Sequence, residues 1–285
     1  MLNKIIDGKK ISEHIQNKIK NKIKKKIKSG KRPPGIAIIL IGNSYSAKIY
    51  VKKKKNACKN VGYIFKYWNF KNHVKENKII NLIKKLNKNK QIDGILIQLP
   101  LPVNMNTNKI LNSISYKKDV DCLHPYNAGC LFQKNPRIHP CTPKGIITLL
   151  KRYKINIKGL NTVIIGDSNI VGRPISMELL KYKCTITITN KHTKNLINYT
   201  KQADLLIVAI GKSNFINKNW IKKNVIIFDV GINKLSNGTI TGDVNFKSVY
   251  EKTSYITPVP GGVGPMTVIS LLENVLYIYE KYYKK

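Results

Sequence analysis

Isoleucines recur at every fourth position near the start of the chain, with lysines between them: Ile11, Ile15, Ile19, Ile23 and Ile27. This spacing places the apolar side chains in one stripe of a helix and the lysines on its solvated side. Ser29-Gly30 ends the pattern. Residues 36–41 are a continuous apolar run, which is typical of a strand buried on both faces. The chain therefore begins with a predicted surface helix followed by a central strand.

Apolar runs and helical patterns alternate through the rest of the chain. Further strands are predicted at 63–67, 92–98, 162–165, 185–189, 204–210 and 225–230. Further helices are predicted at 47–60 (capped by Ser44 or Ser46), 74–87, 106–114, 143–153, 173–182, 194–200 and 266–282. Residues 118–143 are predicted to be an irregular connection, and Ser236-Asn237-Gly238 a hairpin turn. This alternation predicts an α/β fold with a parallel, doubly wound sheet.

Composition narrows the class of protein. The 285 residues suffice for one large domain or two ordinary ones. The sequence has no run of about 18 apolar residues, which argues against a membrane span, and its first residues lack the apolar centre of a signal peptide. The five cysteines are irregularly spaced without a CxxC pair, so we expect free thiols in a reducing compartment and no metal site. We expect a soluble, cytoplasmic protein.

The formal net charge of +38 raises the question of a polyanionic partner. The lysines, however, are spread along the whole chain together with abundant isoleucine and asparagine. These residue types have A/T-rich codons, so a biased genome accounts for the charge. The sequence also lacks an RNA-binding signature, a zinc finger and a basic groove interleaved with aromatic residues. We therefore expect no nucleic-acid partner, although the charge should attract small anionic ligands.

Residues 162–174 have the layout of a nucleotide-binding strand, turn and helix. A β-branched run ends at the polar turn Gly166-Asp167-Ser168, and Gly172 and Arg173 begin the helical pattern. The glycines follow G-x-S-x-x-x-G rather than the full dinucleotide fingerprint, so an ordinary α/β corner remains an alternative. If the turn binds a phosphate, its N–H groups, the helix dipole and Arg173 would all contribute.

The end of the next strand indicates which dinucleotide would fit. An NAD site places an acidic residue about 20 residues beyond the glycines, where it binds the ribose 2′-hydroxyl. The corresponding stretch, Thr189-Asn190-Lys191-His192, has no acidic residue, and Lys191 would suit a 2′-phosphate. The sequence therefore favours NADP over NAD; the alternative is a solvated lysine in a lysine-rich protein.

Two further positions are suggestive only by their spacing. Tyr50 and Lys54 lie four residues apart and share one face of the predicted helix. Lys54 belongs to a run of four lysines, so composition alone favours a solvated side chain, and Tyr50 alone favours a packing role. Gln98 ends a predicted buried strand, and ligands of open α/β sheets bind at that edge.

Five sequence motifs occur together and in order: Ser46–Lys55, Asp93–Pro102, Lys118–Asp121, Gly166–Pro174 and Thr257–Thr267. They closely resemble the bifunctional methylenetetrahydrofolate dehydrogenase/methenyltetrahydrofolate cyclohydrolase family in its bacterial form. The resemblance covers nearly the whole chain, and the phrases QLPLP and PVPGGVGPMT are highly specific. It implies NADP-linked oxidation of methylenetetrahydrofolate to the methenyl form, followed by hydrolysis to 10-formyltetrahydrofolate. It implies no metal.

The resemblance also assigns roles to residues of the folate side. It makes Lys54 the central residue of the cyclohydrolase step, moving a proton during water attack through an amine of lowered pKa. It has Gln98 orient Lys54, Tyr50 stack on the aromatic middle of the folate, and Asp121 accept hydrogen bonds from the pterin. The backbone of Pro260-Gly261-Gly262 would close over the pterin.

On the cofactor side, the resemblance has the turn Gly166-Asp167-Ser168 contact the phosphates and the backbone of Ile232 flank the nicotinamide. Two positions depart from the family pattern. Cys122 stands where glycine is usual, which costs of order 1 kcal/mol if the position has positive φ and would shift Asp121. Asn190-Lys191 replaces a more usual His-Arg pair, which keeps the charge but loses the bidentate fork. His124 and His139 are expected to pack or cap loops.

The resulting expectation is two α/β units that flank a cleft. Residues 1–140 form the folate-binding unit, with the helix 266–285 packing back on it, and residues 141–265 form a Rossmann-like NADP-binding unit. The family implies a homodimer. Two alternatives remain: an enzyme of the same fold that keeps only the dehydrogenase, and a basic polyanion-binding protein built on an inactive fold.

Overall fold

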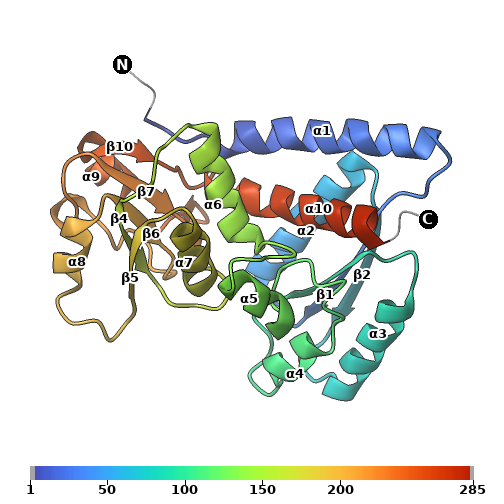
Figure 1. Cartoon of the computed structure of the whole chain (residues 1–285). Helices are drawn as coiled ribbons and strands as arrows, with labels where there is room; N and C mark the ends of the chain where they lie inside the picture. The colour runs from blue at the N-terminus through green and yellow to red at the C-terminus, as the bar shows by residue number, and fades with distance from the viewer. Residues whose placement is uncertain (1–3, 283–285) are drawn as a thin grey trace. The chain divides into compact units, whose positions relative to one another are not determined.

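The computed structural model describes residues 4–282, apart from the side chains of Tyr45 and Ser46 (Figure 1). The chain divides into two compact units. One comprises the N-terminal segment up to Glu13 with Thr142–Thr267; the other comprises His14–Cys141 and the segment from Val268 onward. Helices α1 (Gly8–Lys28) and α10 (Val263–Tyr282) each begin in the first unit and continue into the second.

The unit built on His14–Cys141 contains a parallel sheet with strand order β2-β1-β3 among its described residues. These strands are β1 (Gly35–Ile41), β2 (Ile64–Phe70) and β3 (Gly94–Gln98). Its helices are α2 (Tyr45–Val61), α3 (Glu76–Lys88), α4 (Thr107–Asn112) and α5 (Pro125–Phe132). Every residue of β1 is buried, as its apolar run predicts, and α3 and α4 pack on one face of the sheet through Ile79, Ile83 and Ile110.

The other unit holds a parallel sheet in which the described strands have the order β10-β7-β6-β4-β5. The strands are β4 (Asn161–Ile165), β5 (Thr185–Thr189), β6 (Leu205–Val208), β7 (Val225–Asp229) and β10 (Thr253–Ile256). Around it lie α6 (Cys141–Arg152), α7 (Gly172–Lys181), α8 (Leu196–Gln202), α9 (Phe246–Val249) and the 3-10 turns η1 (Lys218–Trp220) and η2 (Tyr250–Lys252). The order reverses between β4 and β6, and dinucleotides bind at such a switch point.

Local sequence explains where the helices that carry the site begin and end. The Ser44 side chain accepts a hydrogen bond from Ala47 N and caps α2, while the other predicted cap, Ser46, lies outside the described side chains. Gly62 ends α2 with φ 84°, a left-handed conformation that favours glycine. The predicted hairpin is present as β8 (Asn233–Lys234) and β9 (Ile240–Thr241), which pair antiparallel.

Several elements differ from the sequence prediction. Residues 118–143 are not wholly irregular, because α5 forms inside them, with the His124 side chain as its cap and Pro125 in its first turn. Strand β10 and helix α9 were not predicted. α6 begins at Cys141 and α10 at Val263, two and three residues earlier than expected. Short elements held by tertiary contacts leave a weak periodic pattern, which is why the sequence did not show them.

Candidate active site

The Lys54 amine lies against the end of β3. Its Nζ donates a hydrogen bond of 2.9 Å to Oε1 of Gln98, and the Gln98 amide donates in turn to the carbonyl of Leu99 at 3.1 Å. Lys54 is only 7% exposed, whereas its neighbours Lys53 and Lys55 are exposed. Burial lowers the pKa of the Lys54 amine, although the Asp121 carboxylate opposes that shift. One lysine of the run thus differs chemically from the others.

Asp121, in the segment between α4 and α5, lies close enough to the same amine to act on it by charge. Burial raises the pKa of its carboxyl group, while Lys54 and a hydrogen bond from Cys141 act in the opposite direction. The backbone N–H of Cys141 donates to Asp121 Oδ1 at 3.3 Å. The structure therefore brings Lys54, Gln98 and Asp121 together.

Tyr50 precedes Lys54 by one helical turn and is half-buried. Burial raises the pKa of its hydroxyl group. The ammonium of Lys53 lies 5.9 Å from the centre of the Tyr50 ring, within cation–π range. The ring is thus partly accessible and carries a cation beside it.

A hollow of about 600 Å³ opens at the same edge of this sheet. Its walls come from the loop between β1 and α2, which includes Asn43 and Ser44, and from the loop after β3, which includes Pro100 and Pro102. The first loop leads into the helix that carries Tyr50, and the second follows Gln98 directly. The hollow therefore lies beside the segments that carry these two residues, and it is a candidate ligand site.

The turn after β4 has the close backbone approach that a phosphate site requires. A Cβ atom on Gly172 would meet the carbonyl oxygen of Gly166 at 1.8 Å. Gly166 has φ 112°, and a Cβ there would meet the Ala209 carbonyl oxygen at 2.4 Å. Only glycine fits at these two positions, so the residues present form a cradle suited to a dinucleotide phosphate.

Side chains around this turn form hydrogen bonds with backbone groups of the same turn. The Ser168 hydroxyl accepts a hydrogen bond from Val171 N at 3.2 Å, and the Arg173 side chain donates to the Asp167 carbonyl at 3.0 Å. Asp167, Ser168 and Arg173 are all exposed. Arg173 is therefore fixed beside the start of α7 with part of its guanidinium group accessible to a phosphate.

Lys191 follows the end of β5, next to the same turn. The Gly166 N–H donates to the carbonyl of Thr189 at 2.9 Å, so the two loops lie side by side. The side chain of Asn190 turns back to accept a hydrogen bond from His192 N, which leaves Lys191 exposed. This geometry is compatible with a cation that contacts a ribose 2′-phosphate.

Two more predicted positions lie in this unit. Ile232, after β7, is 41% exposed. A Cβ on Gly264 would lie 3.6 Å from its side chain, so Ile232 packs beside the PVPGGVGP segment. In that segment Gly261 has φ 110° and a Cβ on Gly262 would meet the Pro258 carbonyl oxygen at 2.5 Å. Pro260-Gly261-Gly262 therefore presents bare backbone.

Cys122 does have positive φ, at 60°, as expected for a residue where the family has glycine. Its side chain is buried. Asp121 nevertheless keeps its contact with Cys141 N and faces Lys54.

Sequence reasoning missed the residues that hold this loop. Asp119 is buried and accepts hydrogen bonds from the N–H groups of Asp121, Leu123 and His124 and from the Asn127 amide. The Asn274 amide binds the carbonyls of Val120 and His139. The repeat of aspartates in Asp119-Val120-Asp121 could have suggested a loop-forming carboxylate.

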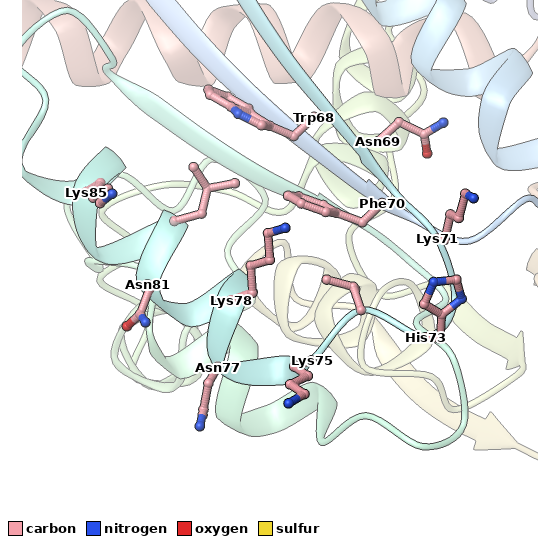
Figure 2. A pocket seen from close by; sticks show the side chains of 12 residues that line it. Trp68, Asn69, Phe70, Lys71, His73, Lys75, Asn77, Lys78, Asn81 and Lys85 are labelled. Atoms are coloured by element: carbon pink, nitrogen blue, oxygen red, sulfur yellow. The ribbon is translucent and has the colours of Figure 1, made fainter.

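A second hollow lies away from these groups, along the edge strand β2 (Figure 2). It measures about 950 Å³ and is lined by Trp68 and Phe70 of β2 together with residues of α3. Figure 2 shows both aromatic side chains on β2, with Lys78 and Lys85 projecting from α3. The Lys78 ammonium lies 6.0 Å from the centre of the Phe70 ring.

Neither a metal-binding cluster nor a membrane-spanning helix is found in residues 4–282. Those residues contain no cluster of three or more His, Cys, Asp or Glu side chains that could hold a metal ion. Among them, no helix is long and apolar enough to cross a membrane. In the described structure none of the five cysteines is joined in a disulfide.

Comparison with known proteins assigns both units. Residues 6–121 match the catalytic domain of tetrahydrofolate dehydrogenase/cyclohydrolase, and residues 140–283 match its NAD(P)-binding domain. The bifunctional protein FolD of Buchnera aphidicola subsp. Cinara cedri is 60% identical over 279 residues, which are 97% of this chain and 98% of that protein.

Solved structures agree with this assignment. The bifunctional FolD methylenetetrahydrofolate dehydrogenase/cyclohydrolase of Campylobacter jejuni is 43% identical, with a TM-score of 0.94 over 97% of this chain and 99% of that one. The Trypanosoma brucei enzyme, solved with NADP and an inhibitor, is 29% identical, with a TM-score of 0.94 over 99% and 98% of the two chains. The chain belongs to the tetrahydrofolate dehydrogenase/cyclohydrolase family.

Proposed function

We propose that this enzyme oxidises 5,10-methylenetetrahydrofolate with NADP and hydrolyses the resulting 5,10-methenyl compound to 10-formyltetrahydrofolate. The family supports both activities. The observation that carries the second activity is the 2.9 Å hydrogen bond between the buried Lys54 amine and Gln98. Burial lowers the pKa of the Lys54 amine, so this lysine releases its proton more readily than a solvated lysine does.

In the hydrolytic step, a water molecule attacks the methenyl carbon and gives up a proton. The bond from that carbon to N5 then breaks as N5 takes a proton, which leaves the formyl group on N10. We assign the proton transfer to neutral Lys54. Gln98 accepts the hydrogen bond from Nζ and so directs the amine lone pair. Asp121 stabilises the protonated form of Lys54 by charge and accepts hydrogen bonds from the pterin, while Tyr50 stacks on the aromatic middle of the folate.

In the dehydrogenase step, NADP supplies the hydride acceptor. The protein contributes no acid or base, only positioning. Gly166, Asp167 and Ser168 form the phosphate turn, and the dipole of α7 with Arg173 adds positive potential. Lys191 contacts the 2′-phosphate and makes the enzyme prefer NADP. The backbone at Ile232 flanks the nicotinamide, and Pro260-Gly261-Gly262 approaches the pterin where side chains would clash.

The test is to measure both activities side by side in the wild-type enzyme and in Lys54→Met. We expect the variant to lose cyclohydrolase activity by at least a hundredfold and to keep measurable dehydrogenase activity. Lys55→Met, a change at the exposed neighbour, is the matched control and should leave both activities unchanged. Hydrolysis by Lys54→Met at near wild-type rates would refute the assigned role.

The wild-type measurements decide between this function and its rivals. Hydride transfer without hydrolysis would indicate an enzyme that keeps only the dehydrogenase. Salt-sensitive DNA binding without turnover would indicate a polyanion-binding protein on an inactive fold. We place the active enzyme in the cytoplasm, where the folate substrate and NADP are available.

We also propose that the enzyme is a homodimer, joined at the free edge of β2. Among the described residues, that strand pairs with β1 and with no strand on its other side, and Tyr67 on it is 40% exposed. An edge strand with an unpaired row of backbone groups favours pairing with a second copy. Light scattering should give twice 32.4 kDa. Tyr67→Asp should yield monomers, whereas Tyr277→Asp, at an equally exposed tyrosine of α10, should not.

A further inference from the structure

Two buried carboxylates lie at the carboxyl edge of the sheet β10-β7-β6-β4-β5. Asp229 is the last residue of β7, and Asp243 follows β9 by two residues. Their exposed fractions are 4% and 0%. Neither belongs to the phosphate turn or to the folate side, and the proposed chemistry uses neither of them directly.

Asp229 accepts hydrogen bonds from the backbone on both sides of the β8–β9 hairpin. Its Oδ1 accepts from Gly231 N and from Asp243 N, both at 3.0 Å. Its Oδ2 accepts from Val244 N at 2.9 Å. The Asp229 side chain therefore fixes the chain just before Ile232 to the chain that returns after β9.

Asp243 extends this network to the loop after β6. Its Oδ2 accepts hydrogen bonds from Ile210 N at 2.7 Å and Gly211 N at 2.9 Å. Its Oδ1 accepts from the side-chain amide of Asn233, the residue after Ile232, at 2.8 Å. One carboxylate thus ties the loop after β6 to the loop after β7.

The carboxylates fit into spaces left by glycine. A Cβ on Gly231 would meet the Asp243 carboxyl carbon at 2.1 Å, and a Cβ on Gly242 would meet Asp229 Oδ2 at 1.8 Å. The Asp243 carboxylate therefore fills the space that a side chain at residue 231 would need. The Asp229 carboxylate fills the corresponding space at residue 242. The two loops therefore pack closely against each other through the two carboxylates.

The network reaches the cofactor turn and the PVPGGVGP segment. The loop after β6 contacts the phosphate turn where Ala209 packs against Gly166. The backbone N–H of Asp229 donates to the Thr257 hydroxyl at 2.8 Å, immediately before Pro258. The carboxylate pair is therefore the common anchor of the loops that surround Ile232.

The arrangement is costly for stability. In the described part of the chain, neither carboxylate forms an ion pair with a lysine or arginine. Burial raises the pKa of Asp229 to about 7, although its three amide donors favour the ionised form. A buried carboxylate without a cationic partner costs stability, and the hydrogen bonds that Asp229 and Asp243 accept offset part of that cost.

We propose that Asp229 and Asp243 are positioning residues for the dehydrogenase step. By accepting backbone hydrogen bonds they hold Ile232 and the loop 209–211 at a fixed separation, so that the nicotinamide half of NADP binds in one orientation. The inference rests on the proposed contact between Ile232 and the nicotinamide. The adenosine half, bound near Lys191, does not depend on the pair.

The test uses the full-length enzyme with Asp243→Ala. The probes are NADP and 2′-phospho-ADP-ribose, a fragment that lacks the nicotinamide. We expect the Kd for NADP to rise at least tenfold and the Kd for the fragment to change less than threefold. The dehydrogenase kcat should fall at least tenfold, while cyclohydrolase activity stays within twofold of the wild type.

Asp243→Asn is the conservative variant. Its oxygen can still accept from Ile210 and Gly211, and the Asn233 amide can turn to accept from the new NH2 group. We expect this variant to recover most of the NADP affinity. Asp204→Ala is the matched control. The Asp204 carboxylate also accepts a hydrogen bond from a backbone amide, Asn161 N, at 2.8 Å, but it lies at the amino edge of the sheet. It should lower stability and leave the Kd for NADP unchanged.

Three outcomes would overturn the inference: an NADP Kd within threefold of the wild type in Asp243→Ala, equal losses for NADP and the fragment, or an asparagine variant as impaired as the alanine variant. If Asp243→Ala does not fold, Asp229→Asn gives the same test, because a single oxygen cannot serve both sets of amide donors. Lys191→Ala should weaken NADP and the fragment alike. Its failure to do so would count against the proposed cofactor site and leave the carboxylate pair to be judged on its own data.

Discussion

At the scale of single residues, burial separates chemical roles that composition hides. The chain has 52 lysines and arginines, and a lysine in a run of four is ordinarily solvated. Lys54 is buried against Gln98 while Lys53 and Lys55 are exposed, because the helical period turns one position in the run toward β3. The sequence resemblance predicted this residue, and spacing alone did not.

Lys191→Ala tests the cofactor preference at this scale. Removing a cation from the 2′-phosphate should raise the KM for NADP about tenfold or more, and should leave the KM for NAD within twofold. Steady-state kinetics with both dinucleotides measures this. Lys201→Ala, at an exposed lysine of α8, is the control. An equal rise for NAD and NADP would place the 2′-phosphate contact elsewhere.

Substitutions at Cys122 measure the cost of having a residue other than glycine at this position. Its φ of 60° lies in the left-handed region, which costs a residue with a Cβ about 1 kcal/mol. Because the buried thiol also contributes packing, the informative comparison is between Cys122→Gly and Cys122→Ala, both of which lack it. Urea unfolding should show the glycine variant to be more stable by about 1 kcal/mol. Greater stability of the alanine variant would contradict the strain.

At the scale of elements, the long periodic segments followed from the sequence and the short ones did not. The isoleucine stripe predicted α1, and the apolar runs predicted β1, β3, β4 and β7. Helix α5 escaped prediction because its eight residues show little periodicity and are fixed by contacts such as that of Asn127 with Asp119. The same reason applies to the site: Asp119, Asp229 and Asp243 act through backbone groups that only the fold brings together.

Lys118 stabilises the end of α3, an element distant from it in the sequence, through direct hydrogen bonds. Its buried amine donates to the carbonyls of Leu86 and Asn89 at the end of α3, at 2.9 and 2.7 Å. We expect Lys118→Met to lower the free energy of unfolding by about 1–3 kcal/mol, because it leaves those carbonyls without this donor. Urea unfolding measures the loss, and an unchanged midpoint would contradict it.

The pH dependence of Lys118 follows from its pKa. Burial lowers this pKa to about 8, below the ordinary value of 10.5. The unfolded chain therefore binds the proton more tightly, and the contribution of Lys118 to stability rises as the pH increases from 8 to 10.5. The stability difference between wild type and Lys118→Met should grow over that range. A constant difference would mean that the amine is not perturbed.

For the molecule as a whole, the large positive net charge affects both the stability of the fold and the binding of anionic ligands. A net charge of +38 repels itself and attracts anionic ligands. Raising KCl from about 20 to 300 mM shortens the Debye length several-fold, so the Tm should rise while the KM values for the folate and for NADP also rise. Scanning calorimetry and kinetics over the same salt series measure both. A Tm that falls with salt would contradict net self-repulsion.

In the proposed mechanism, Lys54 acts as a buried amine that can lose its proton, and it serves hydrolysis rather than hydride transfer. The most direct measurement is the pH dependence of both activities in one preparation, with Lys54→Met as the blank for spontaneous hydrolysis. Cyclohydrolase activity should increase with pH through an apparent pKa below 10.5, the ordinary lysine value, and dehydrogenase activity should not follow it. A cyclohydrolase profile that is flat, or that is identical to the dehydrogenase profile, would contradict the account.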